Sequence, residues 1–159
     1  MITVVGGKYQ QRKYVRSMVN FCIDSLMPRL KHKLDITVEL KTNKDGLGDN
    51  LGTCIWEDTN NRPRLFLIEA CSKLNMRTLL ITIAHEMVHV KQFARNEQKH
   101  MIRANKVKWM GKTVDTNKVS YWELPWEIEA NGRETGLFIN WCVTNKLGHK
   151  KWTFDKNEL

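Results

Sequence analysis

The sequence predicts an α+β fold, because helical and strand periodicities both occur within one chain of 159 residues. Residues 8–30 and 76–93 place apolar side chains at steps of three and four, as amphipathic helices do. Residues 34–40 alternate apolar and polar side chains, which is typical of a half-buried strand. The chain has no internal repeat, low-complexity segment or linker, so residues 1–159 are expected to form one domain.

The first half of the chain is predicted to form a long helix followed by strands. The helix is expected from Lys8 to Leu30, and Pro28 marks its end. Three strands are expected, at residues 34–40, 51–56 and 64–69. The last of them is almost continuously apolar, which predicts a central place in the sheet. A turn is expected at residues 43–48, which contain asparagine, aspartate and glycine.

The second half of the chain is predicted to contain two further helices. The first follows a cap at Ser72 or Asn75, and its apolar stripe comprises Met76, Leu79, Leu80, Ile83, Met87 and Val90. Residues 106–114 are expected to form a short strand or hairpin that bends at Gly111. Pro125 suits the first turn of the last helix, which is expected to reach about Asn145.

Two features near the C-terminus predict how this end of the chain packs. Gly132 and Gly136 are four residues apart on the last predicted helix, so they form a seam of small residues. Another helix is expected to approach closely along this seam. Residues 147–159 are polar and basic, and we expect them to form a loosely held tail.

The charge of the chain bears on its partners. The formal net charge is +9, from 26 lysine and arginine against 17 aspartate and glutamate residues. Such a surface attracts nucleic acid or acidic partners, although solvated faces that keep the protein soluble are the commoner explanation. The basic clusters are Lys8, Arg12, Lys13 and Arg16; Lys31, His32 and Lys33; Lys106, Lys108 and Lys112; and Lys146, Lys150 and Lys151.

Neither a signal peptide nor a membrane span is expected. Residues 1–5 lack the basic start and the apolar length of a signal peptide. The apolar run at residues 79–84 is much shorter than the about 20 residues that a bilayer requires. A cytoplasmic protein is therefore expected. Its four cysteines form no C-x-x-C pair, so they are expected to be reduced, buried thiols.

Residues 85–89 read H-E-x-x-H within the helix expected from residue 76. Residues four apart lie on one face of a helix, so His85 and His89 can direct two imidazoles at one metal ion. Glu86 lies beside them and is placed to take a proton from an activated water and to return it later. Two histidines, an open coordination position and a general base are what zinc hydrolysis requires. The sequence therefore predicts a Zn²⁺ site with Glu86 as a catalytic residue.

A catalytic zinc ion usually has three protein ligands and one water, so a third ligand is required. The metzincin extension of the motif needs a glycine at position 92 and a histidine at position 95. The chain has Gln92 and Arg95 there, which excludes that class. The remaining candidates are Glu127, Glu129 and His100.

Glu127 is favoured by its position on the last predicted helix. Asn131 lies one turn later on the same face and is expected to hold a ligand histidine in place. Glu129 points about 200° away around the helix and cannot share that role. Tyr121, shortly before this helix, is expected at the mouth of the cleft as an oxyanion donor, which makes it the second predicted catalytic residue.

Three blocks of the sequence together resemble a known family. They are His85-Glu-Met-Val-His89 with Gln92, then Trp109-x-Gly111-Lys112, then Leu124-Pro-Trp-Glu-Ile-Glu-Ala130. These blocks are similar to the small SprT-like zinc metallopeptidase domains, in particular to the short versions found in phage genomes. Glu127-Ile-Glu-Ala-Asn131 matches the E-x-x-A-(D/N) pattern of the minigluzincins. The resemblance covers roughly residues 65 to 142.

The resemblance implies a zincin-like (minigluzincin) fold. Such a domain has a long N-terminal helix, a sheet of three or four strands, the motif helix and a C-terminal ligand helix. The implied activity is hydrolysis of peptide bonds in a protein or peptide substrate. The implied site holds Zn²⁺ through His85, His89 and Glu127, with Glu86 as general base and acid. A phage-encoded protein of this kind is expected in the host cytoplasm.

Three alternatives stay open on the sequence alone. Peptide deformylases also use H-E-x-x-H, with a cysteine ligand that Cys54 or Cys71 would have to supply, but their glycine-rich loop is missing here. A non-catalytic module would use zinc only to stabilise its fold and would bind DNA or protein on its basic surface. If the chain is instead a nucleic-acid-binding protein, the H-E-x-x-H sequence at residues 85–89 has no metal-binding role.

Overall fold

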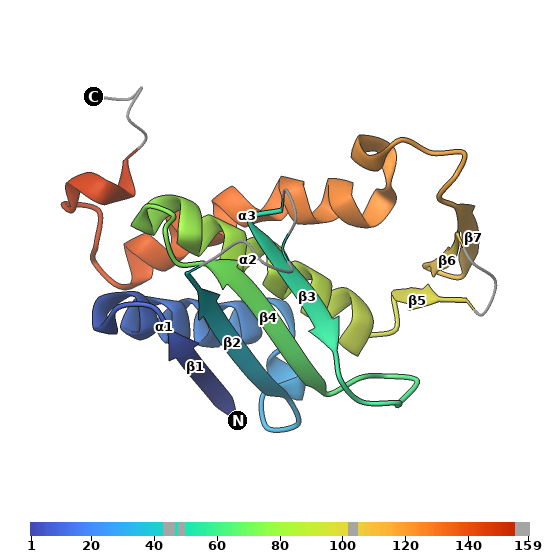
Figure 1. Ribbon diagram of the computed structural model, residues 1–159, viewed down its shortest axis with the longest axis horizontal. Coiled ribbons are helices and arrows are strands. Elements are labelled where there is room, and N and C mark those ends of the chain that lie inside the picture. The colour runs from blue at the N-terminus through green and yellow to red at the C-terminus, as the bar shows by residue number, and fades with distance from the viewer. Residues whose placement is uncertain (43–46, 48–49, 102–104, 155–159) are drawn as a thin grey trace.

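Helices packed on a mixed sheet form the structure in Figure 1, and this α+β architecture agrees with the expected fold class. The computed structural model describes residues 1–42, 47, 50–101 and 105–154. Within these residues the α-helices are α1 (Tyr9–Leu26), α2 (Met76–Ala94) and α3 (Pro125–Thr144). Short 3₁₀ turns lie at η1 (Pro28–Leu30), η2 (Tyr121–Glu123) and η3 (Lys151–Thr153).

The main sheet has the strand order β1-β2-β4-β3. Its strands are β1 (Ile2–Gly6), β2 (Asp35–Lys41), β3 (Gly52–Trp56) and β4 (Leu65–Cys71). β1, β2 and β4 run parallel, and β3 pairs antiparallel with β4 at the edge. The three predicted strands are confirmed to within about two residues. β4 has a partner on each side, as its apolar run predicted.

β1 was not predicted from the sequence. This strand pairs with residues 36–40, and only Val4 of its five residues is buried, so it shows no clear alternation. Its partner strand is also distant in the sequence, which no local pattern can reveal. Gly6 and Gly7 then turn the chain towards α1 with φ angles of +71° and +58°, a backbone conformation that residues with side chains rarely adopt.

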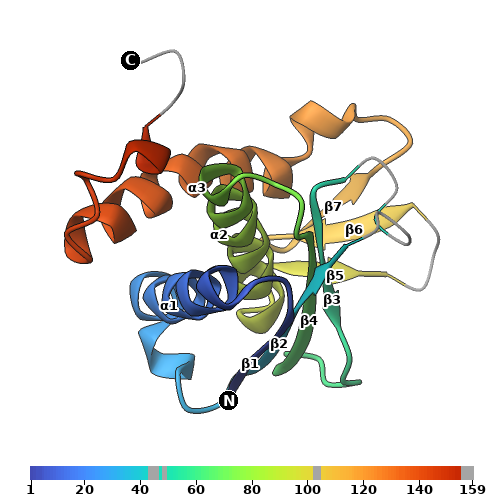
Figure 2. The same cartoon turned by 60° about the vertical axis from the view of Figure 1, so that its left-hand side comes forward.

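α1 and α2 lie on one face of the main sheet (Figure 2), and their side chains form the main core with those of the strands. The predicted first helix is correct except for its end, which lies at Leu26 rather than Leu30. Pro28 disfavours helical backbone at the preceding Met27, whose φ and ψ are −152° and 52°. Residues 28–30 therefore form the separate turn η1.

α2 carries the H-E-x-x-H motif and is anchored in the core. Its N-cap is Asn75, whose side-chain oxygen accepts a hydrogen bond from the Thr78 amide at 2.9 Å. The other candidate cap, Ser72, donates instead to the carbonyl of Lys41. The predicted apolar stripe is confirmed: Met76 is partly buried, and the fully buried members are Leu79, Leu80, Ile83, Met87 and Val90.

A second, smaller sheet follows α2. It has the strand order β5-β6-β7, with β5 (Gln98–His100), β6 (Lys106–Trp109) and β7 (Lys112–Asp115) all antiparallel. The predicted bend at Gly111 is a two-residue turn in which Met110 and Gly111 both have positive φ, as the commonest tight hairpins do. Val107 of β6 packs on Trp126 of α3, which ties this sheet to the last helix.

α3 begins at Pro125 and ends one residue before the predicted Asn145. It packs against α2 through the side of the helix that carries Ala130 and Phe138. The prediction of a close-packed seam at Gly132 and Gly136 is wrong, because a Cβ added at either glycine would meet no atom within 4 Å. Both glycines face outward on the solvent side of α3.

The expectation of a loose C-terminal tail is wrong for residues 147–154. Leu147 and Trp152 pack against the main core, and the Trp152 ring centroid lies 5.3 Å from that of Tyr14. Burial of these two apolar side chains outweighs the basic character of their neighbours. Residues 155–159 lie outside the described residues, as does the predicted turn at residues 43–48 apart from Leu47.

Two other expectations concern membranes and cysteines. Among the described residues, no helix has the length and apolar character needed to cross a bilayer. All four cysteines are free thiols, as predicted. Cys22, Cys71 and Cys142 are buried, whereas Cys54 is only partly buried.

Two alanine substitutions are expected to have opposite effects on stability. Gly6→Ala places a Cβ 2.3 Å from the Leu40 carbonyl oxygen at a positive φ, so it should lower the free energy of unfolding by about 2–4 kcal/mol. Gly132→Ala adds a better helix former in open space and should raise it by about 0.5–1 kcal/mol. Urea unfolding of both variants tests this, and a destabilised Gly132→Ala protein would mean that something does pack on that face.

Candidate metal centre

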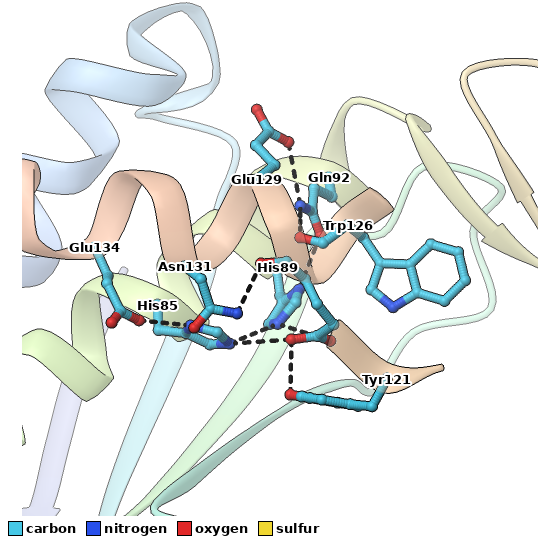
Figure 3. A network of polar contacts seen from close by, with 9 residues as sticks. His85, His89, Gln92, Tyr121, Trp126, Glu129, Asn131 and Glu134 are labelled. Atoms are coloured by element: carbon cyan, nitrogen blue, oxygen red, sulfur yellow. Dashed lines mark hydrogen bonds and ion pairs between the residues drawn. The ribbon is translucent and has the colours of Figure 1, made fainter. Parts of the chain in front are cut away.

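The three predicted metal ligands come together between α2 and α3. Figure 3 shows the two histidines side by side. His85 and His89 lie on successive turns of α2, and Glu127 lies in the first turn of α3. The Nε2 atoms of the two histidines are 3.1 Å apart. Glu127 places one carboxylate oxygen 3.5 Å from His85 Nε2 and the other 3.6 Å from His89 Nε2. The three side chains are close enough to hold one metal ion.

The outer nitrogen of His85 is held by a carboxylate. Its Nδ1 atom lies 2.7 Å from an oxygen of Glu134, two turns along α3 from Glu127. An ionised carboxylate can only accept a hydrogen bond, so the proton of the neutral imidazole is on Nδ1. The Nε2 atom that faces Glu127 is then free of a proton and can act as a ligand.

The outer nitrogen of His89 is held by Gln92, one turn further along α2. The Gln92 amide nitrogen donates to the Trp126 carbonyl at 2.9 Å and to the Glu129 carboxylate at 3.1 Å. These two acceptors fix the orientation of the amide, so its oxygen faces His89. His89 Nδ1 donates to that oxygen at 2.8 Å, which leaves its Nε2 atom as a second unprotonated ligand.

Three electron-pair donors thus converge on one point, and they repel one another unless a positive charge lies between them. The pKa of His85 reflects this. Burial alone would lower it, but the hydrogen bonds to Glu127 and Glu134 outweigh burial and raise the pKa to about 10. Without a metal, a proton on His85 supplies the missing charge. A bound cation would supply that charge and leave both histidines neutral.

Glu86 lies next to this cluster and is nearly buried, at 5% exposure. Burial raises its pKa to about 7, although the nearby His85 opposes the shift. A carboxyl group that titrates near neutral pH can accept a proton and give it back, which suits a general base. Gly52 of β3 leaves room for it, since a Cβ at this position would lie 2.7 Å from the Thr82 methyl and 3.1 Å from a Glu86 oxygen.

Two open hollows meet at the cluster, with volumes of about 510 Å³ and about 240 Å³. His85, Glu86 and Tyr121 line both of them. The larger hollow continues over Leu51, Ile81 and Trp122, whereas the smaller one reaches His89, Glu127 and Cys54. A molecule that enters either hollow therefore comes up against the predicted ligands and Glu86.

Tyr121 lies at the rim of these hollows, half exposed, as the sequence predicted. Its hydroxyl donates to a Glu127 oxygen at 2.8 Å. Burial and this hydrogen bond raise the pKa of Tyr121, so the phenol stays protonated at neutral pH. A hydroxyl has only one proton to donate, so Tyr121 must turn away from Glu127 to serve as an oxyanion donor.

The predicted role of Asn131 is wrong. Its side chain donates to the backbone carbonyl of Glu127 at 2.9 Å and does not hold a histidine. Glu134 and Gln92 hold the two histidines instead, and neither role was predicted from the sequence. Spacing alone offered a signal for both, because Glu134 follows Glu127 by two helical turns and Gln92 follows His89 by one.

The other candidates for the third ligand lie outside the cluster. Glu129 pairs with Lys91 at 2.6 Å and with Arg133 at 3.0 Å. The His100 ring lies against those of Trp56 and Phe93, at 5.1 and 6.0 Å between centroids. Within the described part of the chain, no cysteine belongs to a group that could hold a metal ion, which argues against a deformylase-type ligand set.

Comparisons of the chain with protein-family models, with characterised proteins and with solved structures find no match. The assignment of the site therefore depends on its own geometry.

Glu127→Ala is expected to lose stoichiometric metal binding, because it removes one of three ligands. Glu123→Ala is the matched control: Glu123 lies in η2 and bonds to Ser120, outside the cluster. Metal content after dialysis and affinity by chelator competition measure the effect. Equal metal affinity in the two variants would exclude Glu127 as a ligand.

Gln92→Ala and Glu134→Ala are each expected to weaken metal affinity by about 10- to 100-fold, as loss of a group that orients a ligand does. Asn131→Ala should leave affinity within about threefold, because Asn131 contacts only the Glu127 backbone among these groups. The same competition assay compares the three proteins. A larger loss in Asn131→Ala than in the other two would contradict the hydrogen-bond pattern described above.

Proposed function

We propose that this protein is a zinc-dependent metallopeptidase of the minigluzincin type. In this proposal His85, His89 and Glu127 hold the zinc ion, and Glu86 is the general base and acid. One observation carries the proposal: two imidazoles and a carboxylate converge, close enough to hold one ion, beside a buried carboxyl group whose pKa is about 7, at the floor of open hollows. A structural ion needs neither the hollow nor the poised carboxyl.

The donor set supports zinc over other common ions. Zinc bonds of about 2.0–2.1 Å in tetrahedral geometry place ligand atoms about 3.3 Å apart. The two Nε2 atoms are 3.1 Å apart, and each lies 3.5 or 3.6 Å from a different oxygen of Glu127, which is close to this spacing. Magnesium and calcium prefer oxygen ligands, whereas two imidazoles and one carboxylate suit zinc. Three protein ligands also leave one position open for chemistry.

Bound zinc acts as a Lewis acid that polarises a carbonyl group and acidifies water. The protein's own part is to move protons and to position the substrate. Glu86 takes a proton at its carboxylate from the attacking water and passes it to the amine that leaves. Tyr121 stands at the rim, where its hydroxyl can turn from Glu127 towards a developing oxyanion.

The shape of the site favours a polypeptide substrate. The larger hollow offers the apolar side chains of Leu51, Ile81 and Trp122 beside the polar cluster, which is the combination that an amino-acid side chain next to a peptide bond requires. The cytoplasmic location and the binding of nucleic acid by the basic surface stay predictions from the sequence.

Glu86→Gln is expected to fold and to keep one zinc ion per chain but to lose casein hydrolysis by a factor of about 10² or more, because an amide cannot accept the proton. Glu123→Gln, the control, should match the wild type. Removal of zinc with a chelator should abolish hydrolysis in the wild type, and added zinc should restore it.

Two outcomes would contradict this assignment. Loss of zinc from Glu86→Gln would make Glu86 a ligand rather than the base. Zinc binding with equal residual hydrolysis in the wild type and Glu86→Gln would instead favour the alternative of a non-catalytic, zinc-stabilised binding module.

A further inference from the structure

Another hollow shares no lining residue with those at the metal centre. It has a volume of about 450 Å³ and lies between η1, the segment before β4 and the end of α2. Both ribbon views place η1 and the β3–β4 connection at the same end of the strands of the main sheet (Figures 1 and 2). The proposed peptidase activity assigns no role to this hollow.

The hollow combines an apolar floor with a cationic rim. Leu26, Met27 and Ala94 are buried in its floor. Its other lining residues include four arginines and no acidic side chain; the arginines are Arg29, Arg62, Arg64 and Arg95. Four guanidinium groups around one cavity repel one another, so an anion between them is stabilised.

The four arginines are not equally engaged. Arg64 donates to the carbonyls of Pro63 and Ala94, at 2.7 and 2.8 Å, so its side chain is fixed in place. Arg95 pairs with Glu97 at 3.1 Å. Within the described part of the chain, Arg29 and Arg62 have no side-chain hydrogen bond or ion pair, so they are available to a ligand.

Of the four arginines, Arg64 supplies the side-chain hydrogen bond found at the end of α2 among the described residues. The backbone amides of Arg95, Asn96 and Glu97 donate hydrogen bonds to the carbonyls of residues 91–93. The side chain of Arg64 donates to the carbonyl of Ala94. The last carbonyls of the helix are therefore satisfied from within the structure. Arg29 and Arg62 line the cavity and, among the described residues, donate to no carbonyl of this helix end.

We propose that the hollow binds a small organic phosphate monoester. Its phosphate lies against Arg29 and Arg62, and its apolar body covers Leu26 and Met27. A phosphate monoester carries about −1.5 to −2 charges and three acceptor oxygens near neutral pH, which suits several arginines better than a singly charged carboxylate. The volume falls within the range of about 300–1,000 Å³ typical of small-molecule sites.

Calorimetric titration of the full chain at low ionic strength, in a buffer without phosphate, tests the proposal. The probes are phenyl phosphate, inorganic phosphate and benzoate. Phenyl phosphate should bind with one site per chain and at least about tenfold more tightly than either of the others, because only it offers both the dianion and the apolar body. Anions also bind metals, so the titration is repeated on His89→Ala, where phenyl phosphate binding should persist.

The variant Arg29→Ala/Arg62→Ala should weaken phenyl phosphate binding by about 10- to 100-fold, as loss of charge-assisted hydrogen bonds does. The control Lys13→Ala/Arg16→Ala removes two positive charges from exposed positions on α1 and should change the affinity less than about threefold. Neither pair contributes a side-chain hydrogen bond among the described residues, so both proteins should fold, which circular dichroism checks.

Each contrary result overturns the proposal. Absence of binding to the wild type would refute the site, and loss of binding in His89→Ala would assign the anion to the metal centre instead. Equal weakening in the two double variants would mean that net charge alone attracts the probe. Binding of inorganic phosphate as tight as that of phenyl phosphate would remove the role of the apolar floor, and tighter binding of benzoate would make the ligand a carboxylate.

Discussion

The fully buried amide of Gln92 is the interaction on which the metal centre depends. One end of the amide bonds to the Trp126 carbonyl and the Glu129 carboxylate, and the other accepts the proton of His89. A buried amide left without partners costs about 1–3 kcal/mol, so each of these bonds is needed to keep the buried side chain satisfied. The same group therefore sets how α3 lies against α2 and which nitrogen of His89 faces the ligand cluster.

A buried ion cluster also holds α3 against α2. Lys91 is only 5% exposed, and its ammonium lies 2.6 Å from both Glu97 and Glu129. Removing one partner of such a group leaves a buried charge, at a cost of about 3–5 kcal/mol. Glu129, which the sequence offered as a ligand, thus serves α3 as its anchor to α2 while Glu127, on the opposite side, reaches the histidines.

α2 contributes to two chemically different sites. Its middle turns carry His85, Glu86 and His89, where acidic side chains and imidazoles gather around a place for a cation. Its last residues, Ala94 and Arg95, border the arginine-lined hollow, where positive charge gathers around a place for an anion. The two sites share no lining residue, so each can be altered without touching the contacts of the other.

The sequence by itself determined the motif helix and its burial and the strands β2 to β4, and it favoured Glu127 over Glu129 as the third ligand. Those features depend on periodicity and on positions around one helix, which are local properties of the chain. Only the tertiary structure decided which groups hold the two histidines, where β1 pairs, and that Trp152 packs on Tyr14. It also brought together the arginines at positions 29, 62, 64 and 95. These contacts join segments far apart in the chain, and no pattern within a single segment encodes them.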